Sequence, residues 1–125
     1  MTPKYFSVEE ANAILKTIEP LVARLVEKRA KVSRMSTEIG PLLLDLHNNV
    51  GGPVTSEMTQ DFVEIERLVE KIQASGCILK DINSGLLDFL SLRNGREVYL
   101  CWRYGEEKIE FYHELHTGFN GRRPL

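Results

Sequence analysis

The spacing of apolar residues changes at Gly76, and this change divides the chain into two parts. Before Gly76, apolar side chains recur at alternating steps of three and four, which is typical of helices with one buried face. After Gly76, they alternate with polar ones, as in strands whose two faces differ. We therefore expect one domain over residues 1–125, with a helical hairpin over 1–76 and an antiparallel sheet with a C-terminal tail over 77–125.

The first helix is predicted to begin at Ser7 and to be long. Ser7 and Glu10 have the spacing of a capping box, in which each side chain binds the backbone amide of the other residue. A heptad seam follows through Ala11, Ile14, Ile18, Leu21, Leu25, Val32, Met35, Ile39, Leu42 and Leu46. Pro20 should kink this helix, and Gly40-Pro41 either ends it or bends it again.

The second helix is predicted over about Ser56 to Ser75, with Gly76 as the residue that ends it. Its buried face is predicted to hold Met58, Phe62, Ile65, Leu68 or Val69, and Ile72. The first helix outruns the second by roughly 10 Å or more, so its surplus must pack on the rest of the chain or on a second copy. A coiled-coil seam of this kind predicts a homodimer, with an interface made by Leu21, Leu25, Val32 and Met35.

Turn signals predict a four-stranded meander over about residues 77–82, 86–92, 97–103 and 108–114. Asn94-Gly95 is a strong hairpin signal and pairs Leu92 with Glu97 and Phe89 with Leu100. A turn over 83–85 pairs Leu79 with Phe89 and Lys80 with Asp88, and a turn over 104–107 pairs Leu100 with Phe111 and Trp102 with Ile109. The fold class is therefore α+β, a long antiparallel helical hairpin packed on a four-stranded antiparallel meander.

This register assigns the side chains of the sheet to two faces. The core face is predicted to hold Leu79, Leu87, Phe89, Leu100, Trp102, Ile109 and Phe111. The other face is half apolar and carries the cross-strand row Lys80, Asp88, Cys101 and Glu110. Because such a face is rarely left bare, we expect a second protomer or a helix end to cover it.

Histidine and carboxylate side chains near the last strand predict a metal site. The candidate ligands are His113, His116, Glu114, Asp88 and Glu110, and the implied cofactor is a divalent metal. A simpler interpretation stays open, in which Asp88 forms an ion pair with Lys80. His113 then lies at the edge of the core face and binds a backbone group or Ser91.

The C-terminal residues 118–125 combine two glycines with two arginines. Successive backbone amides beside arginines can hold a phosphate or carboxylate, which makes Arg103, Arg122 and Arg123 candidates for binding a small anion. Alternatively, the tail docks Phe119 and Leu125 into an apolar groove while Arg122 pairs with an acid.

Charge and composition narrow the class of protein. The formal net charge of −2 argues against a nucleic-acid-binding protein held by bulk charge. The basic stretch 24–34 predicts either contact with an acidic second helix or, more weakly, with RNA or the ribosome. Two cysteines fit a reducing cytoplasm, and no apolar run of about 18 residues predicts a membrane span.

Several short motifs carry a resemblance to a known family. They are Phe6 to Asn12, Lys80-Asp81, Gly85 to Phe89, Gly95-Arg96, Cys101-Trp102-Arg103, Gly105-Glu106, Tyr112 to Leu115 and Gly118 to Leu125. Over essentially its whole length the chain resembles a bacterial family of conserved proteins, domain of unknown function 2203. The resemblance implies a small bacterial cytoplasmic protein of no established activity, and its motif falls on Asp88, Trp102, Arg103, Gly105, Glu106, His113, Gly118, Gly121, Arg122 and Pro124.

These patterns lead to three hypotheses about function. The first is a non-enzymatic, homodimeric interaction or scaffold protein, suggested by the long heptad helix. The second is a metal- or anion-binding protein or small enzyme, with its site at the sheet and tail around His113. The weakest is an RNA or ribosome contact through Lys28, Arg29 and Lys31.

Overall fold

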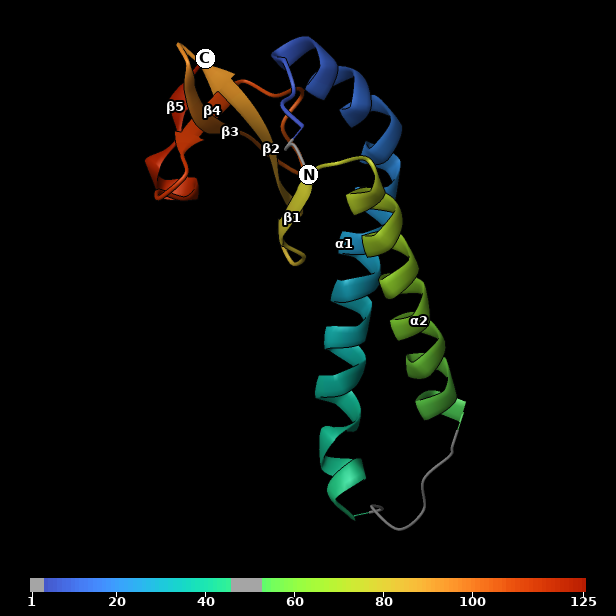
Figure 1. Ribbon diagram of the computed structural model, residues 1–125. Coiled ribbons are helices and arrows are strands. Elements are labelled where there is room, and N and C mark those ends of the chain that lie inside the picture. Colours follow the sequence, from blue (N-terminus) through green and yellow to red (C-terminus); the bar gives the residue numbers. More distant parts are fainter. Residues whose placement is uncertain (1–3, 46–52) are drawn as a thin grey trace.

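The computed structural model describes residues 4–45 and 53–125, and consists of a helical hairpin whose base packs on a five-stranded antiparallel sheet (Figure 1). The hairpin is formed by α1 (Val8–Asp45) and α2 (Pro53–Ala74). The sheet has the order β1 (Ile78–Asp81), β2 (Leu86–Arg93), β3 (Arg96–Arg103), β4 (Phe111–Glu114) and β5 (Arg123–Pro124). A short helix, η1 (Phe119–Gly121), precedes β5. The α+β class is confirmed, with one strand more than predicted.

The long first helix begins as predicted. The Ser7 hydroxyl accepts from the Glu10 amide, and the Ser7 amide donates to the Glu10 carboxylate, both at 3.0 Å. α1 continues through Gly40-Pro41 and ends at Asp45, so its 38 residues span roughly 57 Å. Its ribbon changes direction near residue 20, where Pro20 lacks the amide proton for a helical hydrogen bond (Figure 1).

The surplus length of α1 packs on the sheet of the same chain. Ala11, Leu15 and Ile18 are buried in the core that also contains Phe89 and Trp102. Further along, Leu25 and Val32 are buried in this core, whereas Leu21 and Met35 are partly buried. The side chains of Ile39, Leu42 and Leu46 lie outside the part that the structure describes. The described N-terminal part of α1 therefore packs on the sheet of the same chain.

The buried face of α2 differs from the prediction at one position. Asp61 is buried, whereas the adjacent Phe62 is 48% exposed. Asp61 faces α1 because Lys28 and Lys31 place their ammonium groups 3.2 Å and 3.1 Å from its carboxylate. The remaining ion pairs of the hairpin join Arg24 and Lys28 to Glu64, and Lys31 to Glu57. The prediction that the basic stretch of the first helix faces acidic residues of the second is confirmed.

The central hairpin of the sheet has the predicted register. Asn94 and Gly95 take φ values of 53° and 78°, the left-handed conformations that a tight two-residue turn needs. Leu92 consequently pairs with Glu97, and Phe89 with Leu100.

The first strand pairs differently from the prediction. Ile78 rather than Lys80 is the partner of Asp88, and the ladder is irregular between Leu79 and Asp81. The cause is a longer turn, because the Asp81 carboxylate accepts hydrogen bonds from both the amide and the hydroxyl of Ser84. The predicted Lys80–Asp88 ion pair is therefore wrong.

The predicted register of the strand over 108–114, which corresponds to β4, is also wrong by one residue. Phe111 pairs with Cys101 rather than with Leu100, so Phe111 and Trp102 point to opposite faces of the sheet. The connection over 104–110 is a wide loop, in which the Glu106 carbonyl accepts from Trp102 Nε1 at 3.0 Å and the Glu106 carboxylate accepts from the Arg103 amide at 2.7 Å. Ile109 is buried as predicted, but in this loop before the strand begins.

In the described part of the chain, neither helix combines the length and the apolar composition that crossing a membrane would require.

Candidate functional site

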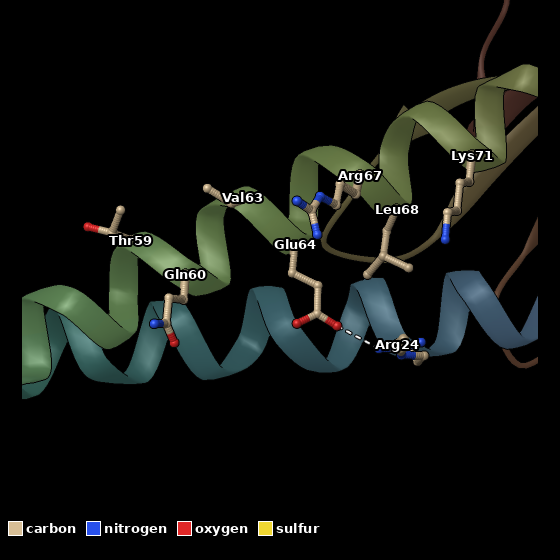
Figure 2. A pocket seen from close by; sticks show the side chains of 8 residues that line it. All are labelled: Arg24, Thr59, Gln60, Val63, Glu64, Arg67, Leu68 and Lys71. Atoms are coloured by element: carbon tan, nitrogen blue, oxygen red, sulfur yellow. Dashed lines mark hydrogen bonds and ion pairs between the residues drawn. The ribbon is translucent and has the colours of Figure 1, made fainter.

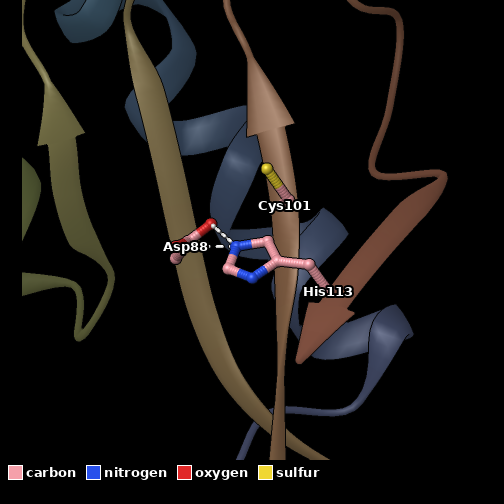
Figure 3. Close-up of side chains that lie close together, drawn as sticks. All are labelled: Asp88, Cys101 and His113. Carbon is pink, nitrogen blue, oxygen red and sulfur yellow. Dashed lines mark hydrogen bonds and ion pairs between the residues drawn. The ribbon is translucent and has the colours of Figure 1, made fainter. Parts of the chain in front are cut away.

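The register of β4 brings three side chains with metal-binding chemistry together. Asp88 on β2, Cys101 on β3 and His113 on β4 lie on the face of the sheet that points away from the helices (Figure 3). One ligand atom of each residue lies within 4.8 Å of the others. All three residues are buried, with exposed fractions of 1%, 0% and 3%.

The two ring nitrogens of His113 have different partners. Nδ1 lies 2.8 Å from the backbone carbonyl of Glu114, and because a carbonyl can only accept, Nδ1 carries a proton. Nε2 lies 3.1 Å from each carboxylate oxygen of Asp88. Metal-ligating histidines donate one ring N–H to a backbone carbonyl or carboxylate in the same way, and bind the metal with the other nitrogen.

The Cys101 thiol is held in its protonated form. Burial, the charge of Asp88 and a hydrogen bond with that carboxylate raise the pKa of Cys101 to about 12, although the positive charge of Arg122 opposes the shift. Cys101 is therefore a poor nucleophile at neutral pH while it stays buried beside Asp88. A bound metal ion could still displace its proton, as thiol ligands are deprotonated on coordination.

The donor set fits a divalent ion of the zinc type. Imidazole nitrogen, thiolate sulfur and carboxylate oxygen are the three ligand types of zinc sites, with bonds of ~2.0–2.3 Å that place ligand atoms roughly 3.3–3.6 Å apart. His113 Nε2 and the Asp88 carboxylate are already about this close, at 3.1 Å, so only the widest separation in the cluster would need to shorten, by about 1 Å. The carboxylate and the thiolate would neutralise the two positive charges, as a buried site requires.

The C-terminal segment runs from β4 through η1 into β5, the edge strand beside β4 (Figure 1). The Arg122 guanidinium carbon lies 4.0 Å from the centre of the Phe111 ring and 4.5 Å from that of Phe119. The same guanidinium forms an ion pair with Glu106. The prediction that Arg122 pairs with an acid is confirmed, but Phe119 and Leu125 stay 36% and 40% exposed rather than docked in a groove.

Several predicted site residues lie apart from this cluster. Glu110 and His116 are exposed, and Glu114 pairs with Arg96 near the helix side of the sheet. The prediction that His113 binds a backbone group or Ser91 is confirmed for the backbone, through the Glu114 carbonyl, whereas the Ser91 hydroxyl donates to the Phe6 carbonyl. His47 lies outside the described residues.

The predicted anion site is not assembled either. Arg122 is engaged by Glu106, the guanidinium of Arg103 stacks 5.1 Å from the Phe119 ring, and Arg123 is exposed.

The cross-strand row of Asp88, Cys101 and Glu110, whose two carboxylates and thiol could ligate a metal, was predicted from the sequence. The Asn94-Gly95 hairpin aligns Cys101 with Asp88 as expected, whereas Glu110 lies in the loop before β4. Glu106 was not predicted as part of the site. Its carboxylate accepts from the Arg103 amide and from the Arg122 guanidinium, and so connects the loop before β4 with the tail after it. The contact with Arg122 spans 16 residues, so no short motif indicates it.

Grooves occur elsewhere on the described surface, away from the cluster. One groove, of about 460 Å³, runs along the hairpin between Arg24 of α1 and one flank of α2, where Val63, Arg67 and Lys71 line it (Figure 2). Lys28 and Lys31, candidates for RNA contact, are ion-paired with α2 next to a second, smaller groove.

The comparisons with known proteins agree with the resemblance. Residues 4–125 match a family model described as "Uncharacterized conserved protein (DUF2203)". Neither a curated protein nor a solved structure matches the chain.

Proposed function

The chain belongs to this family of uncharacterised conserved proteins, and on the geometry of its sheet we propose that it binds a divalent metal ion of the zinc type through Asp88, Cys101 and His113. The observation that carries the proposal is the orientation of His113. Its Nδ1 proton is fixed on the Glu114 carbonyl, so Nε2 is the nitrogen available for a metal, and it points at Asp88.

The charges of the cluster support the same function. In the metal-free protein, Nε2 lies within hydrogen-bond distance of the Asp88 carboxylate, and Cys101 keeps its proton. A bound divalent ion would displace the thiol proton, and the thiolate and the carboxylate would then balance its two positive charges. Three protein ligands leave the fourth position of a tetrahedral ion for a donor from outside the chain.

Calorimetric titration of the metal-free, untagged protein with Zn²⁺ tests the proposal. We expect one ion to bind per chain. His113→Gln and Cys101→Ser should each weaken binding at least ~10-fold, because each removes a ligand. Circular dichroism of each variant establishes that it remains folded.

The chain offers matched controls for both substitutions. His116→Gln removes an exposed histidine three positions away, and Cys77→Ser removes the other buried cysteine. Both should bind Zn²⁺ like the parent protein. Absence of binding to the parent, or equal losses in the His113 and His116 variants, would overturn the proposal.

A homodimeric interaction protein is the second candidate. Phe62 and Val63 are 48% and 44% exposed on the outer side of α2. The same stretch carries acids next to bases, Glu66 beside Arg67 and Glu70 beside Lys71. Two antiparallel copies of such a helix can pair the acids of one copy with the bases of the other. The contact proposed here is therefore the outer side of α2, since Leu25 and Val32 are already buried within the chain.

Sedimentation at tens of micromolar tests this candidate. The parent protein should sediment as a dimer, and Phe62→Glu should produce monomers. Leu92→Glu, which alters a residue that is 50% exposed on the sheet, should leave the dimer intact. A monomeric parent protein would rule the candidate out at that concentration.

A further inference from the structure

The three candidate ligands are closed off from solvent in the folded chain. Asp88, Cys101 and His113 are each no more than 3% exposed, and none of them lines any of the grooves found on the described surface. An ion or reagent can therefore reach Cys101 only if part of the covering structure moves. The question is which part moves at the lowest cost.

Part of the segment 115–125 lies over the face that carries the cluster, because Phe119 stacks on Arg103 of β3 and Arg122 stacks on Phe111, the pairing partner of Cys101. Few contacts hold this segment to the sheet. It joins the sheet through the two residues of β5, which pair with Phe111 and Tyr112, and through the Leu125 amide, which donates to the Glu110 carbonyl at 2.9 Å. Large apolar side chains of the segment remain largely outside the core: Leu115, Phe119 and Leu125 are 45%, 36% and 40% exposed. Segments with little buried apolar surface open locally at a low free-energy cost.

Arg122 makes the strongest contacts of this segment. Its side chain is only 9% exposed, and its guanidinium lies between the Phe111 and Phe119 rings while it pairs with Glu106. Its Nε is buried without a hydrogen-bond partner, which lowers the net stabilisation that the closed position gains from this residue.

We propose that residues 115–125 form a lid over Asp88, Cys101 and His113, and that opening of this lid, held shut by Arg122, controls access to the cluster. As a statement about metal entry, the inference rests on the proposed metal function. As a statement about access to Cys101, it stands without any metal.

Two glycines of the lid provide a matched pair of variants. A Cβ atom at Gly121 would lie 2.7 Å from the Cβ atom of Thr117, which is also in the lid, so Gly121→Ala distorts the conformation in which the lid places Arg122 on the sheet. A Cβ atom at Gly118 meets nothing within 4 Å, and its φ of −129° suits any residue. Gly118→Ala therefore makes the same chemical change without the clash.

The experiment measures the rate at which iodoacetamide alkylates Cys101 in the metal-free protein, followed by peptide mapping. Gly121→Ala should speed the alkylation of Cys101 at least ~10-fold, the effect of about 1.4 kcal/mol on lid closure. Gly118→Ala should stay within about 2-fold of the parent rate. Cys77 lies outside the lid, packed near Ile72, so its rate should not change in either variant.

Equal Cys101 rates in the two variants would overturn the inference. So would a parallel rise of the Cys77 rate in Gly121→Ala, because access would then follow unfolding of the whole domain. The two proposals can fail separately. If Gly121→Ala speeds alkylation but the protein binds no Zn²⁺, the lid proposal stands and the metal proposal fails. If both glycine variants take up Zn²⁺ at the same rate, the metal proposal stands and the lid does not control metal entry.

Discussion

His113 Nε2 lies 3.1 Å from both carboxylate oxygens of Asp88, and the two side chains come from β4 and β2 with β3 between them. A buried carboxylate and a buried imidazole satisfy each other here across a strand that contributes Cys101. The contact depends on the register of β4, because a shift by one residue would turn His113 to the opposite face.

The first prediction concerns the coupling between these two residues in the metal-free protein. Asp88→Ala should lower the free energy of unfolding by about 3 kcal/mol, because it leaves His113 and Cys101 without their buried partner. The double variant Asp88→Ala, His113→Ala should cost less than the sum of the two single variants, by at least ~1 kcal/mol. Urea denaturation of the four proteins measures this coupling. Additive costs would contradict a direct Asp88–His113 interaction.

The second prediction follows from the raised pKa of Cys101, which is about 12 because of burial, the charge of Asp88 and their hydrogen bond. The unfolded thiol loses its proton near pH 8.5, whereas the folded thiol keeps it, so the folded state binds more protons above that pH. Stability should therefore fall as pH rises from about 8.5, with a contribution from Cys101 approaching ~1.4 kcal/mol per pH unit.

Urea denaturation at pH 8 and pH 10 measures this effect. Cys101→Ala should lose less stability over that interval than the parent does. Cys77, whose pKa is raised mainly by burial, contributes in the same direction and is still present in both proteins. Identical losses in the parent and the variant would contradict the prediction.

The third prediction concerns Asp61 in the hairpin. Hydrogen bonds from Lys31 and Lys28 hold the pKa of Asp61 below its ordinary value, although desolvation by burial opposes them as the largest single contribution. A carboxylate with a depressed pKa stabilises the folded state above the unfolded pKa of about 3.9, and this stabilisation disappears as pH falls through the folded pKa.

Asp61→Asn should consequently destabilise the protein at pH 6 by ~1–2 kcal/mol and reduce its sensitivity to acid. Thermal unfolding monitored by helical circular dichroism at pH 6 and pH 2.5 provides the comparison. Glu66→Gln, on an exposed position of the same helix, should behave like the parent. A parent and Asp61 variant with the same acid sensitivity would show that Asp61 does not stabilise the hairpin electrostatically.

The fourth prediction separates backbone strain from packing at two glycines. Gly85 and Gly95 both take positive φ values, 69° and 78°. A Cβ atom at Gly85 would lie 2.7 Å from Tyr104 and 3.0 Å from Val22, whereas one at Gly95 meets nothing within 4 Å. Gly95→Ala should therefore cost about 1 kcal/mol, and Gly85→Ala at least ~1 kcal/mol more. Equal costs in urea denaturation would mean that Gly85 does not sit at a close contact between sheet and hairpin.

Local signals predicted those parts of the fold that short-range interactions determine. The Ser7–Glu10 capping box and the Asn94-Gly95 turn each act within a few residues, and both occur as expected. The alignment of Asp88 with Cys101 follows directly from that turn, so two of the three residues of the candidate site could be placed side by side from the sequence pattern.

The rest depended on contacts between distant residues. The loop before β4 is wide because Glu106 binds Trp102, Arg103 and Arg122, and because Asn12 of α1 accepts from the Ile109 amide. Burial of Ile109 therefore gave no information on strand register, which is why His113 was assigned to the wrong face. Phe62 was misassigned for a similar reason, since ion pairs with α1 bury Asp61 in its place.

The most direct test of the central claim is the absorption spectrum of the metal-free protein after addition of one equivalent of Co²⁺, a spectroscopic substitute for Zn²⁺. A bound thiolate ligand produces a charge-transfer band in the near ultraviolet. We expect this band in the parent protein and in Cys77→Ser, and its loss in Cys101→Ser. No band in the parent, or a band that survives Cys101→Ser, would contradict a metal site formed by Asp88, Cys101 and His113.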